Sequence, residues 1–138
     1  MASFVKYQKG VEALMESINA GSDTWKVALT NRAPVVASDN TLTDASEISA
    51  GNGYTAGGNA ASTTSSSQTG GVYKLILASP STWTASGGSI GPFRYAVLYD
   101  ATTNNLIGYW DYGSAVTLGV GESFTVSLDG TNGVFSVT

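Results

Sequence analysis

Four acidic side chains in the C-terminal half are of the type that glycosidases use as catalytic acid and base: Asp100, Asp111, Glu122 and Asp129. Such a pair must stand roughly 5–10 Å apart across a cleft, and nothing in the sequence around these residues predicts a cleft. The chain has neither histidine nor cysteine. Ser-His-Asp and Cys-His nucleophile systems are therefore excluded, as are imidazole and thiolate zinc sites. We expect a protein that is not an enzyme and uses no cofactor.

Two further patterns have a chemical interpretation and a simpler structural one. The run Ser86–Gly91 (S-G-G-S-I-G) has the glycines of a phosphate-binding loop, but it lacks the Lys-Ser/Thr of a P-loop and no helical pattern follows. The Asp- and Asn-rich stretches at 100–105 and 129–133 offer oxygen ligands for calcium without the spacing of an EF-hand. Gly, Asp and Asn are also the residues that turns prefer. We expect turns at all three places and no metal site.

Aromatic residues form the one cluster in which a binding role competes with packing. Rings on the face of a sandwich, with Asp111 and Asn105 nearby, are typical of a sugar-binding module. Core and subunit packing use the same residues, because buried Tyr and Trp combine a large apolar area with one polar group. We expect packing to dominate and keep four rings as candidate surface contacts: Trp83, Tyr109, Trp110 and Tyr112.

The elements that would carry these residues are strands. The stretch Phe93–Asp100 alternates with the period of a strand, 101–105 is a polar turn, and Leu106–Tyr112 is a second apolar run, so the three predict an antiparallel hairpin. The alternation places on one side of the first strand Phe93, Tyr95, Val97 and Tyr99, and on the other Arg94, Ala96, Leu98 and Asp100.

Further short runs with the apolar pattern of strands recur after residue 23. Further strands are predicted at Trp25–Thr30, Val72–Ala78, Ser81–Ala85, Ala115–Leu118, Glu122–Leu128 and Val134–Thr138. The Ser/Thr-rich run 60–69 has the composition of a flexible linker or of an exposed edge strand, and we favour the strand. With no alternation of strands and helices, the pattern predicts an all-β fold, an antiparallel β-sandwich that is jelly-roll-like.

Residues 4–20 have a helical rhythm instead. Apolar residues recur at helical spacing and predict a short amphipathic helix over about Tyr7–Asn19. We divide the chain into an N-terminal helical arm, 1–22, and a β-sandwich domain, 23–138. The apolar stripe of the helix requires a partner, which is either its own sandwich or a neighbouring subunit. The long connection 35–58 has only weak signals, among them an Asp44-x-x-Glu47 pattern that predicts a capped helical turn.

Composition narrows the class of partner. The formal net charge is −4, and the six basic residues are scattered, which argues against nucleic acid. No apolar run approaches the ~20 residues that cross a bilayer, and Met1–Gly10 lacks the apolar core of a signal peptide, so we expect no membrane partner. Only 12 % of the residues are charged, about half the usual fraction. Such a surface is typical of proteins buried in assemblies and also of some secreted β-domains.

Four phrases, in this order along the chain, resemble a family of small virion proteins of tailed bacteriophages: Trp25–Thr30 (W-K-V-A-L-T), Ser49–Gly58, Gly91–Tyr99 and Leu106–Gly113. The resemblance implies a capsid cement (decoration) protein, a β-sandwich homotrimer that clamps neighbouring subunits of the major capsid protein on the outer shell. Such a protein is made in the cytoplasm of the host bacterium and is located on the capsid surface of the virion.

For that role we expect subunit or capsid contacts in the helical stripe and in the 35–58 connection, namely at Val11, Leu14, Met15, Ile18 and Tyr54. Two other roles stay open. One is a receptor- or glycan-binding module of a head or tail fibre, which would use the surface around Trp83 and Trp110. The other is a component of the tail tube or of the head–tail joint.

Overall fold

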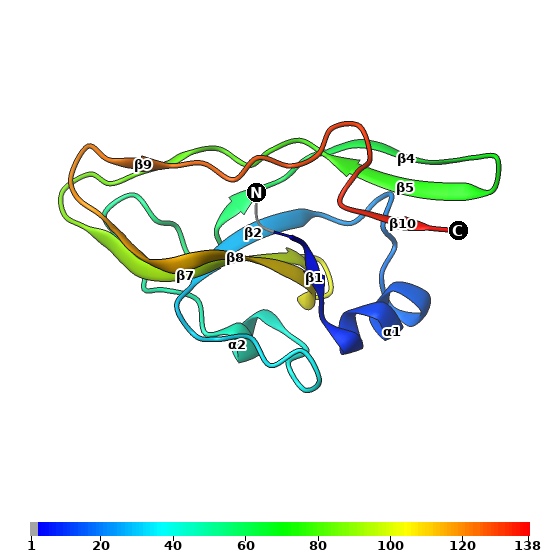
Figure 1. The fold of residues 1–138 in the computed structure, drawn as a ribbon, viewed down its shortest axis with the longest axis horizontal. Coiled ribbons are helices and arrows are strands. Elements are labelled where there is room, and N and C mark those ends of the chain that lie inside the picture. The colour runs from blue at the N-terminus through cyan, green and yellow to red at the C-terminus, as the bar shows by residue number, and fades with distance from the viewer. Residues whose placement is uncertain (1–2) are drawn as a thin grey trace.

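The computed structural model describes residues 3–138. Two layers of antiparallel strands face each other, and two short helices lie against the outer face of the larger layer (Figure 1). The larger layer is a five-stranded sheet with the order β1 (Val5–Lys6), β8 (Asn105–Leu118), β7 (Ile90–Asp100), β2 (Trp25–Thr30) and β3 (Asn59–Ala60).

The second layer consists of two small sheets. One has the order β10 (Phe135–Val137), β5 (Val72–Leu77) and β4 (Thr63–Thr69), and the other pairs β6 (Trp83–Thr84) with β9 (Ser123–Phe124). Every pair of neighbouring strands is antiparallel. The predicted all-β antiparallel sandwich is confirmed, and the jelly-roll arrangement stays a prediction.

Strand β7 is buried on both faces, which explains its almost continuous apolar sequence. One face contributes Leu98 to the core between the two layers, where Trp25, Val27 and Leu29 of β2 also point. The other face contributes Val97 to a second cluster beneath the helices. The full second cluster consists of Tyr7, Ala28, Ala45, Val97, Tyr99 and Leu106.

The predicted alternation along β7 is wrong at its N-terminal end. Phe93 lies in the core between the layers with Ala96 and Leu98, not on the side of Val97. Phe93 pairs with Val116 and Tyr95 with Asp111, so a step of two residues in β7 faces a step of five in β8. This bulge reverses the side to which the chain directs its side chains, and hydropathy alone does not reveal it.

The N-terminal segment is attached to the larger sheet. Strand β1 pairs with β8, and the Tyr7 N–H donates to the Ile107 carbonyl at 3.0 Å. Helix α1 (Gln8–Glu16), shorter than predicted, packs closely against β8 because Gly10 has no side chain. A Cβ at Gly10 would overlap the Leu106 carbonyl oxygen.

One predicted strand is confirmed as an edge strand, and another is shorter than predicted. The run 60–69 does form an edge strand, β4. The predicted strand Glu122–Leu128 pairs only at Ser123–Phe124, because the facing segment contains Pro80, which cannot donate to a ladder. Side chains bridge the two segments instead, for example from the Leu128 N–H to Ser79 Oγ at 2.9 Å.

Helix α2 (Leu42–Ala45) begins earlier than the Asp44-x-x-Glu47 pattern predicted. Asp44 is in the third helical position, where its carboxylate accepts the N–H groups of Asn40 and Thr41, and these bonds lower the pKa of Asp44. Glu47 lies beyond the helix and is not part of the cap.

Candidate functional site

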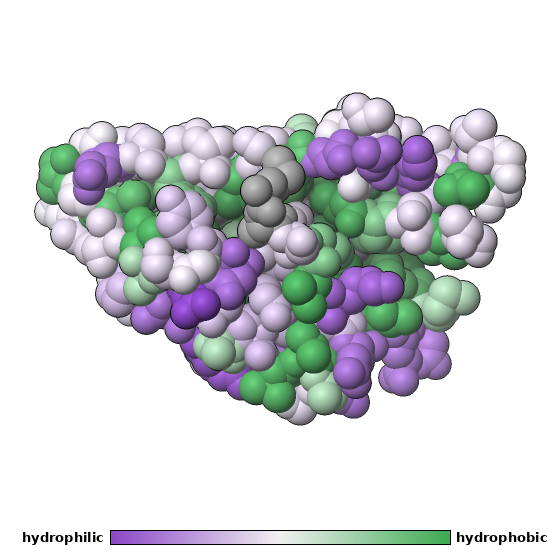
Figure 2. Space-filling model, viewed as in Figure 1, coloured by the Kyte–Doolittle hydropathy of each residue, from purple (hydrophilic) through white to green (hydrophobic). Residues whose placement is uncertain are grey.

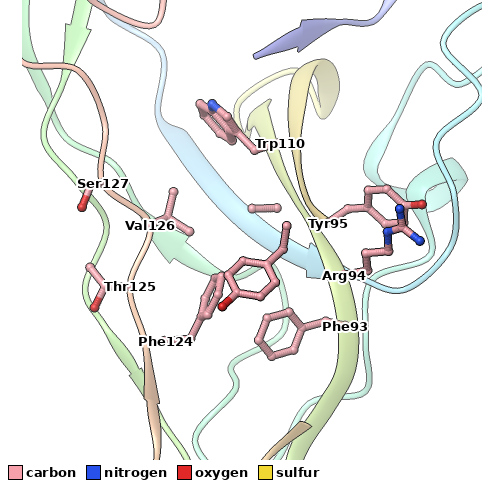
Figure 3. A pocket seen from close by; sticks show the side chains of 10 residues that line it. Phe93, Arg94, Tyr95, Trp110, Phe124, Thr125, Val126 and Ser127 are labelled. Carbon is pink, nitrogen blue, oxygen red and sulfur yellow. The ribbon is translucent and has the colours of Figure 1, made fainter. Parts of the chain in front are cut away.

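An aromatic groove of about 200 Å³ opens between the β7–β8 hairpin and the segment that follows β9. In Figure 3, Phe93, Trp110, Phe124 and Val126 point into the same space, while Arg94 and Tyr95 lie towards the far side of β7. Phe93 and Phe124 meet edge to face with ring centroids 4.9 Å apart. We call this surface the aromatic groove; its lining residues are Phe93, Arg94, Tyr95, Ala96, Trp110, Tyr112 and Phe124–Ser127.

One ion pair involves Arg94, a lining residue of the groove. Arg94 Nε and Nη2 donate to the two carboxylate oxygens of Asp111 at 2.8 and 3.1 Å, and the Gly113 N–H donates to the same carboxylate at 2.8 Å. The guanidinium lowers the pKa of Asp111, so this group is ionised at neutral pH and paired. Because each charge already has its partner, this pair contributes no free charge to the groove, and the groove favours an uncharged ligand.

The predicted aromatic cluster is divided among three environments. Trp83 was expected on the surface, but it is 1 % exposed and belongs to the core, so it cannot contact a partner. Tyr109 lies on the helix side of the sheet, with its ring between those of Tyr7 and Tyr95. Only Trp110 and Tyr112 line the groove, and Tyr112 is 59 % exposed.

The second surface comes from the helical stripe, which the structure splits in two. Leu14 and Ile18 are partly buried against the protein's own core. Val11 and Met15, four residues apart and therefore on one face of α1, are 46 % and 80 % exposed. Figure 2 shows hydrophobic atoms over β1 and the region below it. We define the helix-side surface as the four exposed apolar residues Val5, Val11, Met15 and Val35.

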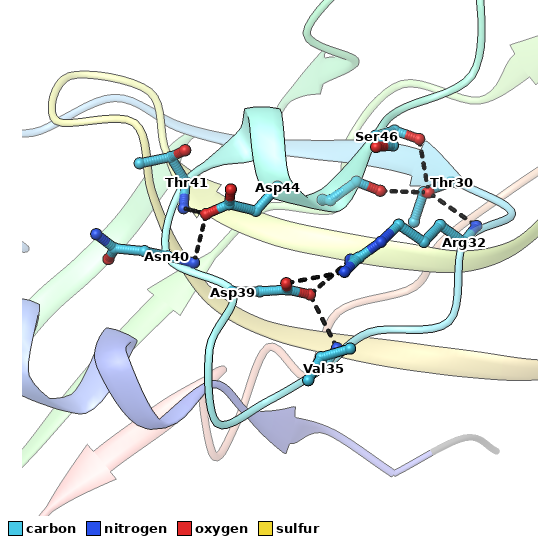
Figure 4. A network of polar contacts seen from close by, with 9 residues as sticks. Thr30, Arg32, Val35, Asp39, Asn40, Thr41, Asp44 and Ser46 are labelled. Atoms are coloured by element: carbon cyan, nitrogen blue, oxygen red, sulfur yellow. Dashed lines mark hydrogen bonds and ion pairs between the residues drawn. The ribbon is translucent and has the colours of Figure 1, made fainter.

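The connection that carries Val35 is held by polar contacts (Figure 4). Arg32 donates to both carboxylate oxygens of Asp39, at 2.7 and 3.1 Å, and the Val35 N–H donates to Asp39 at 2.8 Å. The Gln8 N–H donates to the Val36 carbonyl at 2.9 Å, which fastens this loop to the start of α1. Val35 is thus presented by an ordered loop next to the helix.

Tyr54, predicted as a contact residue, is buried within the protomer. It is 2 % exposed, its hydroxyl donates to Glu47 at 2.6 Å, and the Leu29 N–H donates to that hydroxyl at 3.1 Å. The Gly57 N–H also donates to Glu47. Tyr54 therefore fastens the 47–57 part of the long connection to β2 and has no surface left for a partner.

Two of the carboxylates that suggested a glycosidase, Asp100 and Asp111, do not face each other. Asp100 pairs with Asn105 at the end of the hairpin, whereas Asp111 lies opposite Tyr95. Five residues along β7 separate the two positions, which is about 16 Å at the rise of a strand. Within residues 3–138, no three acidic, His or Cys side chains are grouped as a metal ion would require.

No family model, curated protein or solved structure matches this chain. None of the helices in the described part of the chain is long and apolar enough to cross a bilayer. The two surfaces defined above, with the chemistry of their residues, are therefore the basis for a functional proposal.

Proposed function

We propose that this chain is a capsid cement protein of a tailed bacteriophage, which binds the outer shell as an oligomer and bridges subunits of the major capsid protein. The observation that carries the proposal is the helix-side surface, where Val11 and Met15 are exposed side by side on a helix fixed to the sheet. Exposed apolar groups on an ordered framework bind other proteins at a small cost in conformational entropy.

The rest of the molecule is compatible with that role. Only 12 % of its residues are charged, so close packing against neighbours buries few charges. A cement oligomer binds several sites of a repetitive shell, and each bound protomer raises the effective concentration of the next. Weak single contacts are therefore sufficient for tight attachment to a particle.

The proposal is tested with the double variant Val11→Asp/Met15→Asp and expanded capsid shells. Wild-type protein should bind the shells and raise their melting temperature. The double variant should bind at least roughly tenfold more weakly, because each aspartate would have to be desolvated in the contact. Binding is measured by co-sedimentation and shell melting by scanning calorimetry.

Val120→Asp is the matched control, because Val120 is 69 % exposed but lies in the turn after β8. This control should bind shells as the wild type does, and all variants should keep the same far-UV circular dichroism. Wild-type protein that leaves shell melting unchanged contradicts the cement role.

A second candidate function, a glycan-binding module of a fibre, is favoured by the aromatic groove. Sugar rings pack their apolar faces on aromatic rings, and Tyr112, at the groove, is exposed. If the groove binds glycans, Tyr112→Ala should lose array binding by roughly tenfold, as an anchor ring does. Tyr112→Phe keeps the aromatic ring and should retain most of the glycan binding. Absence of wild-type binding across a glycan array counts against this candidate.

A further inference from the structure

Among residues 3–138, strand β4 has a strand partner on only one of its two edges. In the sheet order β10–β5–β4 it is terminal, and it hydrogen-bonds to β5 from Thr63 to Thr69. The register is unbroken from Ser65 to Thr69. Figure 1 shows the β4–β5 hairpin extending beyond the rest of the molecule, above α1. All seven residues of β4 are exposed or partly exposed.

The other sheet edges in the described chain are protected against pairing with another chain by their shortness or by a bulge. Strands β1, β3, β6 and β9 have two residues each, and β10 has three. The outer edge of β8 beyond β1 contains the bulge opposite Phe93–Tyr95, with Gly113 at φ 103°. Short edges and bulges prevent pairing with another chain, as do charged residues and proline. β4 (T-T-S-S-S-Q-T) has a regular stretch of five residues and neither a charge nor a proline.

The hairpin geometry determines which backbone groups of β4 face outwards. Its loop has two residues, Gly70 and Gly71, both with positive φ, so the closing pair Thr69–Val72 exchanges hydrogen bonds. Hydrogen-bonded and non-hydrogen-bonded pairs alternate along an antiparallel ladder. Ser67 and Ser65 therefore bond to β5, and the N–H and C=O groups of Ser66 and Gln68 point to the free edge.

We propose that this edge pairs with the β4 edge of a second copy of this chain, antiparallel about a two-fold axis that passes beside Ser67. Ser66 of each copy then exchanges both backbone hydrogen bonds with Gln68 of the other copy. The two Ser67 side chains lie directly opposite each other in a non-hydrogen-bonded pair.

The absence of charge in β4 favours a second copy as the occupant. In an antiparallel pair about a two-fold axis, each side chain of β4 lies next to β4 of the other copy. β4 contains only uncharged Ser, Thr and Gln. Self-pairing therefore brings no like charges together, although the chain as a whole carries −4. This contact joins two copies, so a trimer would use another surface, and the inference does not depend on the cement role.

The test is a disulfide, because the natural chain has no cysteine. In a non-hydrogen-bonded pair the Cα atoms stand about 4.5 Å apart, within the range that a disulfide spans. Ser67→Cys should form a disulfide-linked dimer under mild oxidation at least roughly tenfold faster than a control variant. In the control, the cysteine lies outside the proposed contact, so two cysteines meet only when molecules collide at random. Thr131→Cys is that control, since Thr131 is exposed and lines the same outer surface as Ser67.

A second measurement removes the dependence on oxidation. Ser67→Lys and Ser67→Glu each place like charges opposite one another and should sediment as monomers at concentrations where the wild type forms dimers. An equimolar mixture of the two should restore the dimer, because the charges then attract. Equal cross-linking of Ser67→Cys and Thr131→Cys, or identical sedimentation of wild type and Ser67→Lys, overturns the proposal.

Discussion

Gly58→Ala should destabilise the protein by about 3–5 kcal/mol, an effect that few single substitutions reach. Gly58 has φ 80°, a conformation that costs an L-residue about 1 kcal/mol. A Cβ there would also overlap the Val27 carbonyl oxygen and press on Ala28, both in β2. These nearest atoms are all backbone, so no side chain can move aside, and β2 or the connection must shift. The loss in the free energy of unfolding is measured by urea denaturation monitored by tryptophan fluorescence.

Gly71→Ala is the matched control for this substitution. Gly71 has nearly the same φ, 83°, but nothing lies within 4 Å of a Cβ built on it. The control should lose only about 1 kcal/mol, the cost of the backbone conformation alone. Equal losses in the two variants would show that Gly58 is not packed against β2.

Asp100→Asn should stabilise the protein at alkaline pH by about 2–4 kcal/mol and have little effect near pH 4. Asp100 is 0 % exposed, and one of its carboxylate oxygens has no hydrogen-bond partner among residues 3–138. Burial, and to a smaller extent the nearby carboxyl of Asp23, raises the pKa of Asp100 from 3.8 to about 7. The protonated acid can donate to Asp23, whereas the ionised form is buried beside a like charge.

The sign of the pH dependence follows from the raised pKa. The folded state binds the proton of the Asp100 carboxyl more tightly than the unfolded state does. The stability that this protonation contributes is therefore complete below about pH 4 and is lost as the pH rises to about 7. Asparagine keeps the acceptor for the N–H groups of Thr102 and Thr103 and supplies a permanent donor towards Asp23. Melting temperatures between pH 4 and pH 9 measure the difference between wild type and variant.

Asp129 provides the control, because its carboxylate also accepts the N–H groups two and three residues ahead, at Thr131 and Asn132. It is exposed, and these bonds lower its pKa. Asp129→Asn should therefore give no stabilisation at alkaline pH. If Asp100→Asn were less stable than the wild type at pH 8, Asp100 would have to be ionised and compensated in the folded protein.

The sequence predicted best the elements whose pattern depends on neighbours along the chain. The β7–β8 hairpin followed from an alternating run, a polar turn and a second apolar run, and β4 followed from the composition of the Ser/Thr-rich run 60–69. The bulge opposite Phe93–Tyr95 was missed because it depends on how many residues of β8 face β7. The shortening of the predicted strand 122–128 depends on Pro80, more than 40 residues away.

The functional surfaces were predicted less well, for a similar reason. A helical stripe shows that an apolar face exists, but not whether the protein's own core covers it; here Leu14 is partly covered and Met15 is not. Trp83 and Trp110 have the same residue type, and only the fold buries the first and places the second at a groove. The other wall of that groove, at Phe124 and Val126, was visible in the sequence only as an alternating strand pattern.

We propose that this protein works by binding other proteins in many repeated copies. The most direct measurement is its copy number per particle, from quantitative mass spectrometry of purified virions with the major capsid protein as internal standard. A cement protein should be present in a number comparable to that of the capsid subunits, on the order of hundreds, as repeated attachment to a symmetric shell requires. A handful of copies per virion, or none, would contradict it.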